Sequence, residues 1–432
     1  MKIEPIPMCD STKQVEAIKL LNEPSLQPLF QKINEGYLYW DKVKYLTPKG
    51  FEQSILWQAV KFQRQSQAKT LKFGKYSFSF VITTQMQAML HEFDLNLRGN
   101  LQTESNITSS LKDYYLINSI MEEAIASSQI EGASTTRKIA KDMLRKRLKP
   151  ADKSQQMISN NYETISKISK NQSDLSIEAL LDIHSSITNK TLAHSEEEGV
   201  FRMHDNIFVV DAISGYVAHT PPAYAEINSM IEDLCDFANK ENNEEFIHPI
   251  VKAIIIHFML AFIHPFTDGN GRTARSLFYW YMIKKGYWLS EYLSISRIIY
   301  SNKKAYERAF LYTENDNNDL SYFIQYHLSV IKKAFDDLKK YLQLKTNQQE
   351  DLFRFSSLSS INERQRYVLR ILLEGKKSMF IPKELATQFN ISIKSARTDL
   401  QELVELGYLR TINLNKRAVG YIKSDGIEGL LE

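Results

Sequence analysis

The segment His264–Arg275, with the sequence HPFTDGNGRTAR, gathers side chains that are suited to acid–base chemistry and to phosphate binding. An unperturbed histidine has a pKa of about 6.5, so His264 can accept a proton from a hydroxyl group at neutral pH. Asp268 offers a hard carboxylate oxygen, the kind of ligand that Mg²⁺ combines with nucleotide phosphates. A candidate base and a candidate metal ligand therefore lie in one short stretch.

The second half of this segment has the pattern of an anion site. Gly269 and Gly271 flank Asn270 at the start of a helix that we expect over 271–285. Backbone N–H groups at a glycine-rich helix start bind anions. Arg272 and Arg275 are three residues apart, so they share one helix face and can both reach bound phosphates.

The elements around the segment are predicted from apolar periodicity and from proline. The run Ala253–Ile263 is apolar on nearly all sides, which predicts a helix buried in the middle of a bundle. Because Pro265 disfavours helical angles at the residue before it, this helix should end near His264 and present the imidazole in a loop. We interpret His257, on the same helix, as a core histidine rather than a catalytic one.

The segment resembles the signature of the Fic family, HPFxDGNGRxxR, at every fixed position. The resemblance covers roughly residues 105–345 and implies a helical Fic fold that transfers AMP from ATP to a Ser, Thr or Tyr hydroxyl of a protein. It implies that His264 is the base and that Asp268 holds Mg²⁺. The ATP-binding residues that it implies are Gly269, Asn270, Gly271, Arg272, Thr273, Ala274, Arg275 and, less directly, Tyr306, for which a packed aromatic is the alternative.

A second element resembles the inhibitory motif (S/T)xxxE(G/N) of the same family, and its residues here are Ser127, Glu131 and Gly132. It lies at the end of a predicted amphipathic helix, Tyr115–Ile130. Glu131 paired with Arg275 would withdraw the arginine from the γ-phosphate of ATP and leave the nucleotide in an unproductive pose. The alternative is a surface glutamate before a C-cap glycine. The apolar face of the helix should be formed by Ile117, Ile120, Met121, Ala124, Ile125 and Ser128.

Two extended runs, Asn206–Asp211 and Tyr216–His219, flank a Ser214-Gly215 turn and predict a β-hairpin. The hairpin lies where the family has a flap that aligns the target by adding a strand to it. We expect the flap edge at Ile207, Phe208, Val209 and Val210, with an ordinary hairpin as the alternative.

A separate C-terminal domain should follow a polar linker at Lys345–Asp351. Three helices and two strands around Asn415 resemble the winged helix-turn-helix plan. Over residues 361–424, twelve Lys and Arg residues outnumber six Asp and Glu residues. On the helix Ser392–Leu406 the side chains expected to face DNA are Lys394, Ser395, Arg397 and Thr398, and those expected to face the core are Ile393, Ala396, Leu400, Leu403 and Val404. A solvated face or a protein-binding module is the alternative.

The composition of the chain excludes several other classes of protein. The chain has 432 residues, 43% of them hydrophobic and 24% charged, which excludes a disordered or collagen-like protein. A formal charge of +3 does not by itself imply a nucleic-acid partner. Two cysteines cannot form a disulfide framework, and we find no signal peptide or membrane span, so we expect a cytoplasmic protein without a membrane partner.

Together these features predict a mainly α fold, with a Fic helical core, a small β-hairpin flap and a C-terminal winged helix-turn-helix domain. The expected boundaries are an accessory region at 1–104, a catalytic domain at 105–345 with the inhibitory helix near 115–131, and the C-terminal domain at 355–432. The leading hypothesis is an autoinhibited protein adenylyltransferase that uses ATP and Mg²⁺ and modifies a target protein or itself. DNA and a second copy of the chain are further candidate partners. The alternatives are a DNA-binding regulator with a nucleotide-sensing site, and an enzyme that also removes AMP.

Overall fold

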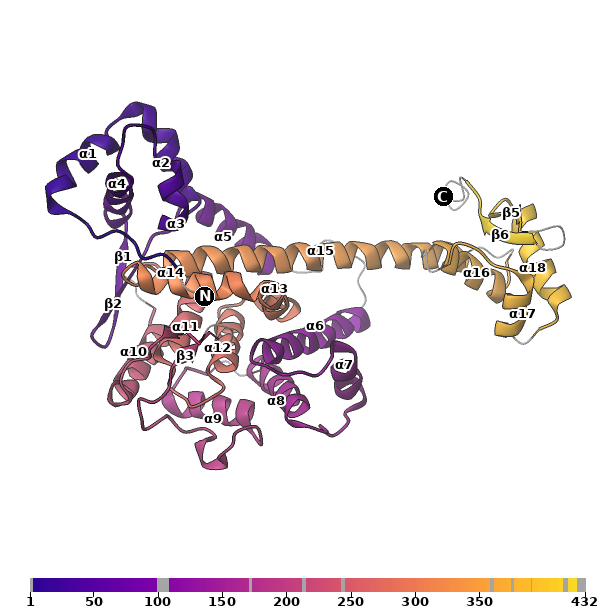
Figure 1. Cartoon of the computed structure of the whole chain (residues 1–432). Helices are drawn as coiled ribbons and strands as arrows, with labels where there is room; N and C mark the ends of the chain where they lie inside the picture. Colours follow the sequence, from indigo (N-terminus) through magenta and orange to yellow (C-terminus); the bar gives the residue numbers. More distant parts are fainter. Residues whose placement is uncertain are drawn as a thin grey trace. The chain divides into compact units, whose positions relative to one another are not determined.

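The computed structural model describes residues 3–98, 109–170, 173–211, 215–241, 245–357, 361–373, 377–389, 391–414 and 419–425. These residues form two compact units (Figure 1), and each is described by itself. The first unit holds the described residues up to 338, and the second begins at residue 339. Helices dominate both units, as the sequence predicts.

The N-terminal residues form helices around a two-stranded sheet. Strand β1 (Lys69–Phe73) pairs antiparallel with β2 (Tyr76–Phe80). The helices are α1 (Gln14–Leu21), α2 (Gln27–Glu35), α3 (Trp40–Val43), α4 (Gln53–Gln65) and α5 (Thr84–Leu97). Sequence analysis treats residues 1–104 as an accessory region, whereas residues 3–98 belong to the same compact unit as the central helices. Contacts between distant residues join them: the Tyr37 hydroxyl donates to Asp319 at 2.7 Å, and Arg64 donates to the Tyr322 hydroxyl at 2.9 Å.

The central part of the first unit is a bundle of helices with one small hairpin. The hairpin pairs β3 (Val209–Val210) with β4 (Val217–His219). The helices are α6 (Ser109–Ile130), α7 (Arg137–Lys146), α8 (Lys153–Ile168), α9 (Ile177–Thr188), α10 (Ile227–Asn239), α11 (Pro249–Ile263), α12 (Asn270–Lys284), α13 (Ile295–Ser301), α14 (Lys303–Asn315) and the start of α15 (Ser321–Ser357). The helices expected over Tyr115–Ile130, 253–263 and 271–285 correspond to α6, α11 and α12.

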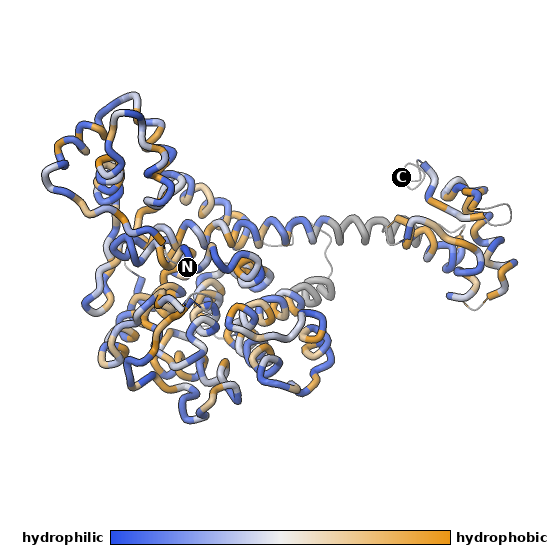
Figure 2. Tube along the Cα trace, viewed as in Figure 1, coloured by the Kyte–Doolittle hydropathy of each residue, from blue (hydrophilic) through white to orange (hydrophobic). Residues whose placement is uncertain are grey.

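Helix α11 is the buried centre of this bundle, as its apolar run predicts. It begins at His248, whose side chain accepts from the Ile250 N–H, with Pro249 in the first helical position. It ends at His264, which has a left-handed backbone with φ of 49°. Because α11 is apolar on every side, neighbouring helices cover it all round, and the helix most extensively packed on it is α12. Figure 2 shows polar and apolar residues alternating along most of the other helices, as expected for elements with one buried face.

Two expectations about individual segments are wrong. The segment 345–351, expected as a linker, lies inside the continuous helix α15. Its Lys, Gln and Glu residues favour helix, and it contains neither Gly nor Pro to interrupt one. On α6, Ile120, Met121, Ala124, Ile125 and Ser128 are buried as expected, but Ile117 is 45% exposed, and it is the preceding Leu116 that packs against Ile120, Ala124 and Ile165.

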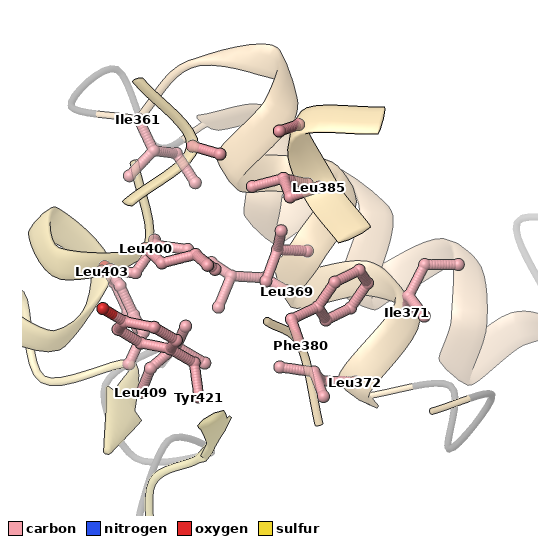
Figure 3. Packing of buried hydrophobic residues seen from close by; sticks show 14 residues of the cluster. Ile361, Leu369, Ile371, Leu372, Phe380, Leu385, Leu400, Leu403, Leu409 and Tyr421 are labelled. Atoms are coloured by element: carbon pink, nitrogen blue, oxygen red, sulfur yellow. The ribbon is translucent and has the colours of Figure 1, made fainter. Parts of the chain in front are cut away.

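The second unit contains three helices followed by a hairpin, in the order expected. These are α16 (Glu363–Leu373), α17 (Pro382–Phe389), α18 (Ile393–Glu405), β5 (Leu409–Asn413) and its antiparallel partner β6 (Val419–Lys423). Asn415, where the turn is expected, lies outside the described residues. Figure 3 shows the core, in which Leu369, Phe380, Leu400 and Tyr421 converge. Ala396, Leu400 and Leu403 face this core, but Ile393 is 50% exposed, because at the first position of α18 it lies beyond the neighbouring elements.

Among the described residues, no helix combines the length and the apolar character needed to cross a membrane.

Candidate active site

His264 is held in a conformation that exposes one ring nitrogen as a base. Its backbone N–H closes the last turn of α11 on Leu260 O at 3.0 Å, and its Nδ1 lies 3.2 Å from Ala261 O. Because a carbonyl oxygen only accepts, Nδ1 carries the proton and Nε2 keeps its lone pair. Burial lowers the pKa of His264 to about 4, so the imidazole is neutral at pH 7.

The loop after His264 is fixed by buried polar contacts. Arg202, 4% exposed, donates through Nε to His264 O at 3.0 Å, and its backbone N–H donates to Pro265 O at 2.8 Å. The Asn270 side chain accepts from Phe266 N and donates to Phe266 O, at 3.0 and 2.8 Å. The side chain of Asn270 therefore closes the loop, although the resemblance places this residue among the ATP ligands.

His184 on α9 is a loop-holding residue that sequence analysis misses. Its ring stacks on Phe266 with centroids 3.6 Å apart, and its Nδ1 accepts from Gly199 N at 3.0 Å. Nε2 therefore carries the proton and donates to Asp268 O at 2.8 Å. Burial lowers the pKa of His184 to about 4, which keeps this neutral tautomer at pH 7. No local sequence pattern links His184 to a loop that lies 84 residues further along the chain.

Asp268 presents its carboxylate to solvent at the start of α12. The side chain is 52% exposed, and Oδ1 accepts from Gly269 N and lies 3.7 Å from Arg272 Nη2. Among the described residues, no group of three or more His, Cys, Asp or Glu side chains is arranged to hold a metal. A single carboxylate is nevertheless enough for Mg²⁺ where phosphates and water supply the other ligands.

The two glycines of the motif are required for different reasons. Gly269 has φ of +83°, and a Cβ there would lie 2.7 Å from Thr188 Cγ2. A Cβ on Gly271 would lie 2.2 Å from Glu131 Oε1. Gly269 thus permits the turn into α12, and Gly271 makes room for the carboxylate of Glu131.

Arg272 and Arg275 are buried and have nitrogens without a partner among the described residues. Arg272 is fully buried and donates through Nη1 to Ile187 O at 3.1 Å, while its Nε and Nη2 have no hydrogen bond. Arg275, 1% exposed, likewise leaves Nη1 without one. Unsatisfied buried guanidinium nitrogens are costly, and an anion such as a phosphate would satisfy them.

Glu131 pairs with Arg275, as the inhibitory motif implies. Arg275 Nη2 donates to Glu131 Oε1 at 3.0 Å and to Ser127 O at 2.9 Å. Arg275 Nε donates to the Ser127 hydroxyl at 2.9 Å. Gly132, with φ of +95°, ends the turn after α6. Ser127 and Glu131 thus occupy three of the N–H donors of Arg275.

A pocket of about 300 Å³ brings these parts together. Its walls come from the catalytic loop, the end of α6, the hairpin and one face of α14; they include His264, Gly271, Glu131, Val209, Val210 and Tyr306. Tyr306 also packs in the core, where its hydroxyl lies 2.9 Å from His257 Nε2, as the alternative of a packed aromatic expects; its contact with ATP stays a prediction.

The other predicted residues of the first unit do not line this pocket; they are Ser127, Gly132, Ile207, Phe208, Asp268, Gly269, Asn270, Arg272, Thr273, Ala274 and Arg275. Thr273 and Ala274 are fully buried within the bundle, and the Thr273 hydroxyl donates to Gly269 O at 3.0 Å. Ile207 and Phe208 precede strand β3, and Phe208 is 49% exposed. In this conformation the hairpin contributes Val209 and Val210 to the pocket.

In the second unit, Lys394, Ser395, Arg397 and Thr398 are all exposed on α18. The Ser395 N–H and the Thr398 hydroxyl bond within the helix or its cap, to Ser392 Oγ and Lys394 O. The two basic side chains have no ion pair among the described residues. This face of α18 is therefore polar and open to a partner.

Comparisons with known proteins agree with the site. Residues 174–282 match the Fic/DOC family. Protein adenylyltransferase Fic of Nematostella vectensis is 33% identical over 126 residues, which are 29% of this chain and 27% of that protein. Protein adenylyltransferase fic-1 of Caenorhabditis elegans is 33% identical over 123 residues, 28% of this chain and 22% of that protein. The chain thus spans about a quarter of the length of these relatives.

A solved structure of Fic-1 from C. elegans matches with a TM-score of 0.50 at 19% identity, covering 77% of this chain and 88% of that chain. The chain therefore contains a Fic domain with a mainly helical Fic fold.

Proposed function

We propose that this chain is an autoinhibited protein adenylyltransferase that transfers AMP from ATP to a protein hydroxyl, on another protein or on itself. The observation that carries the proposal is the neutral His264, with Nε2 free, in a pocket beside two buried arginines that have unsatisfied nitrogens. The names of the relatives that match the Fic domain support the same reaction.

ATP fits the donors that this site leaves unsatisfied. Nε and Nη2 of Arg272 and Nη1 of Arg275 need acceptors, and phosphate oxygens supply them. Gly269 and Gly271 bring the start of α12 close to any anion bound there. The apolar part of the pocket, with Phe310 and Leu311 of α14, is suited to a nucleoside.

Asp268 would hold Mg²⁺ together with the phosphates, because its carboxylate is exposed and lies next to Arg272. Bound Mg²⁺ would neutralise charge that develops on the leaving phosphates. His184 keeps the Asp268 backbone in place through its bond to the carbonyl.

In the transfer step, the target hydroxyl gives its proton to His264 Nε2 while its oxygen bonds to the α-phosphorus. The bond from the α-phosphorus to the bridging oxygen breaks, and pyrophosphate leaves. Arg272 and Arg275 stabilise the charge on the pyrophosphate. The products are an AMP ester on the target and free pyrophosphate.

Autoinhibition follows from the contacts of Glu131. While Glu131 and Ser127 hold Arg275, its Nε and Nη2 donors are occupied and unavailable to a γ-phosphate, and the carboxylate of Glu131 repels that phosphate. The hairpin would align the target, since Val209 and Val210 lie in the same pocket as His264.

The variant His264→Ala tests the reaction. Labelling by ATP carrying a label in the α-phosphate should fall about 10²-fold or more, because the variant lacks the proton acceptor. ATP affinity should stay nearly unchanged, because the phosphate donors remain. His91→Ala, which removes an exposed histidine on α5, is the matched control and should label like the parent. Equal labelling by His264→Ala and the parent would end the proposal.

For the second unit we propose DNA binding through α18. The exposed Lys394 and Arg397, without an ion pair among the described residues, support this role. The order of three helices and a hairpin supports a winged helix-turn-helix module.

A further inference from the structure

Glu123 is a buried carboxylate on α6, the helix that carries Glu131 at its end. It is 2% exposed and lies eight residues before Glu131, on the part of the helix packed into the bundle. Its Oε2 accepts from the Ser294 hydroxyl at 3.1 Å and from Ser296 N at 2.9 Å. Its Oε1 accepts from the Ser296 hydroxyl. All three donors belong to the first turn of α13 or to its N-cap.

Helix α13 leads directly into the wall of the pocket. Asn302 ends α13 and caps α14, and α14 lines the pocket with Tyr306 and Phe310. Lys303, at the start of α14, donates to Ile130 O at 2.9 Å. Helix α6 packs along α13, and hydrogen bonds between described residues join α6 to the α13–α14 segment at Glu123, which is buried, and at Ile130.

Glu131 can pair with Arg275 only if α6 stays close to its observed position. A Cβ placed on Gly271 would lie only 2.2 Å from Glu131 Oε1, so the carboxylate is packed directly against the start of α12. The bond to Arg275 is 3.0 Å long. A displacement of α6 by about one ångström would either produce a clash or break this bond.

Burying a carboxylate between two helices carries a desolvation cost that an apolar contact does not have. Burial raises the pKa of Glu123, and the bonds from Ser296 oppose that rise. An apolar contact would bury the same surface without the desolvation cost. The carboxylate adds directional hydrogen bonds to the packing of α6, because its three donors hold Glu123 at one position relative to the start of α13.

We propose that Glu123 is a positioning residue for autoinhibition: its bonds to the first turn of α13 set α6 so that Glu131 reaches Arg275. The proposal rests on the proposed function for its effect on activity. Its structural part, the placement of the 127–132 segment, holds independently of any activity.

Glu122 provides a matched control on the same helix. Its carboxylate pairs with Arg137 and Lys141 of α7 instead of α13. Substituting Glu122 removes a neighbouring glutamate and its ion pairs but leaves the connection to α13 intact. Glu123→Ala and Glu122→Ala can therefore be compared directly in the full-length chain.

Hydrogen exchange tests the placement without activity. The amides of Glu131, Gly132 and Ala133 donate to backbone carbonyls of Ser128 and Gln129 at 3.0–3.1 Å, so they are protected. In Glu123→Ala they should exchange at least about tenfold faster than in the parent, and in Glu122→Ala at the parent rate. Unchanged exchange in Glu123→Ala overturns the proposal, whatever the labelling assay shows.

Labelling with ATP tests the regulatory effect. Glu123→Ala should label severalfold more than the parent, and adding it to Glu131→Gly should give no further gain, since both relieve one restraint. A purely structural residue would instead lower labelling by the same factor in both backgrounds, and that result also overturns the proposal. If Glu131→Gly itself does not label, the proposed function fails, while exchange still decides the role of Glu123.

Two further variants cover the case in which Glu123→Ala does not fold. Ser296→Ala removes one of the three donors from the opposite side and should produce a weaker form of the same exchange and labelling effects. Glu123→Gln keeps the size and one acceptor oxygen for Ser296 N, so it should stay closer to the parent than Ser296→Ala. The reverse order would contradict the assigned contacts.

Discussion

At the scale of single residues, the site depends on histidines that burial keeps neutral. Burial lowers the pKa of His184 and of His264 to about 4 in each case. His184 uses both ring nitrogens to hold the loop, whereas His264 uses only one and keeps Nε2 for a proton. Both side chains are neutral imidazoles, and their different contacts give them different roles.

The pH dependence of labelling should reflect this burial. In the Glu131→Gly background, kcat/KM for ATP should stay level from about pH 8 to pH 6 and fall only as the pH approaches 4, because kcat/KM reports the free enzyme. A fall centred near pH 6.5 would mean that the base has an ordinary histidine pKa.

The lowered pKa of His264 should also make the free energy of unfolding depend on pH, and this dependence serves as a control. Between pH 4 and about 6.5 the unfolded chain binds more protons at His264 than the folded chain, so the free energy of unfolding should rise with pH in that window. His264→Ala should show a smaller rise, measured by denaturant unfolding at several pH values. An identical rise in both proteins would contradict the assigned shift.

At the scale of elements, the end of α6 acts on the start of α12. Glu131 lies in the turn after α6, so a substitution there does not interrupt the helix. Its partner Arg275 keeps two bonds to Ser127 when the carboxylate is removed. The charge of Glu131 can therefore be removed with the packing of α6 left in place.

Glu131→Gly should raise labelling at least about tenfold above the parent, because the Arg275 Nη2 donor that Glu131 occupies becomes available to the γ-phosphate and the repelling carboxylate is gone. The measurement is the rate of incorporation of labelled AMP, with melting temperature and ATP binding checked in parallel. Adding Arg275→Ala should abolish the gain, since the freed partner is then missing. If a folded, ATP-binding Glu131→Gly labels no faster than the parent, the contact with Arg275 does not inhibit.

At the scale of the whole chain, two compact units carry different chemistry. The first contains the pocket and helix α6, together with the N-terminal residues 3–98. The second contains an apolar core of its own and an exposed basic face on α18. If the first unit transfers AMP and the second binds DNA, as we propose, joining them in one chain would restrict modification to targets found where the second unit binds.

The double variant Lys394→Ala with Arg397→Ala should weaken DNA binding by the full-length chain. It should also reduce the slope of log affinity against log salt by about 0.9 for each phosphate that the variant no longer neutralises. Fluorescence anisotropy with a labelled duplex measures both quantities. Lys19→Ala with Lys32→Ala, which removes the same charge from exposed positions of the first unit, should leave them unchanged. No DNA binding by the parent even at low salt would favour a protein-binding role for this unit.

The sequence by itself determined the parts of this protein whose function depends on neighbours in the chain. The end of α11 at His264, the glycines before α12 and the spacing of Arg272 and Arg275 all follow from consecutive residues, because a helix end, a proline and a glycine turn are local events. The same holds for the hairpin of β5 and β6. The pairing of Glu131 with Arg275 was reached only through the resemblance to a family motif.

Only the tertiary structure decided which distant side chains hold these parts in place. His184, Arg202 and Glu123 act on residues that are 62 to 173 positions away along the chain, and their roles depend on which helix faces meet. Periodicity shows that a face is buried but not what it is buried against. The sequence also did not show that α15 continues without a break, because a polar segment between two apolar patterns is compatible with a linker or with an exposed helix. The helix continues through this segment because its residues favour helix and neither glycine nor proline stops it, whereas the contacts of His184, Arg202 and Glu123 depend on packing that no local preference determines.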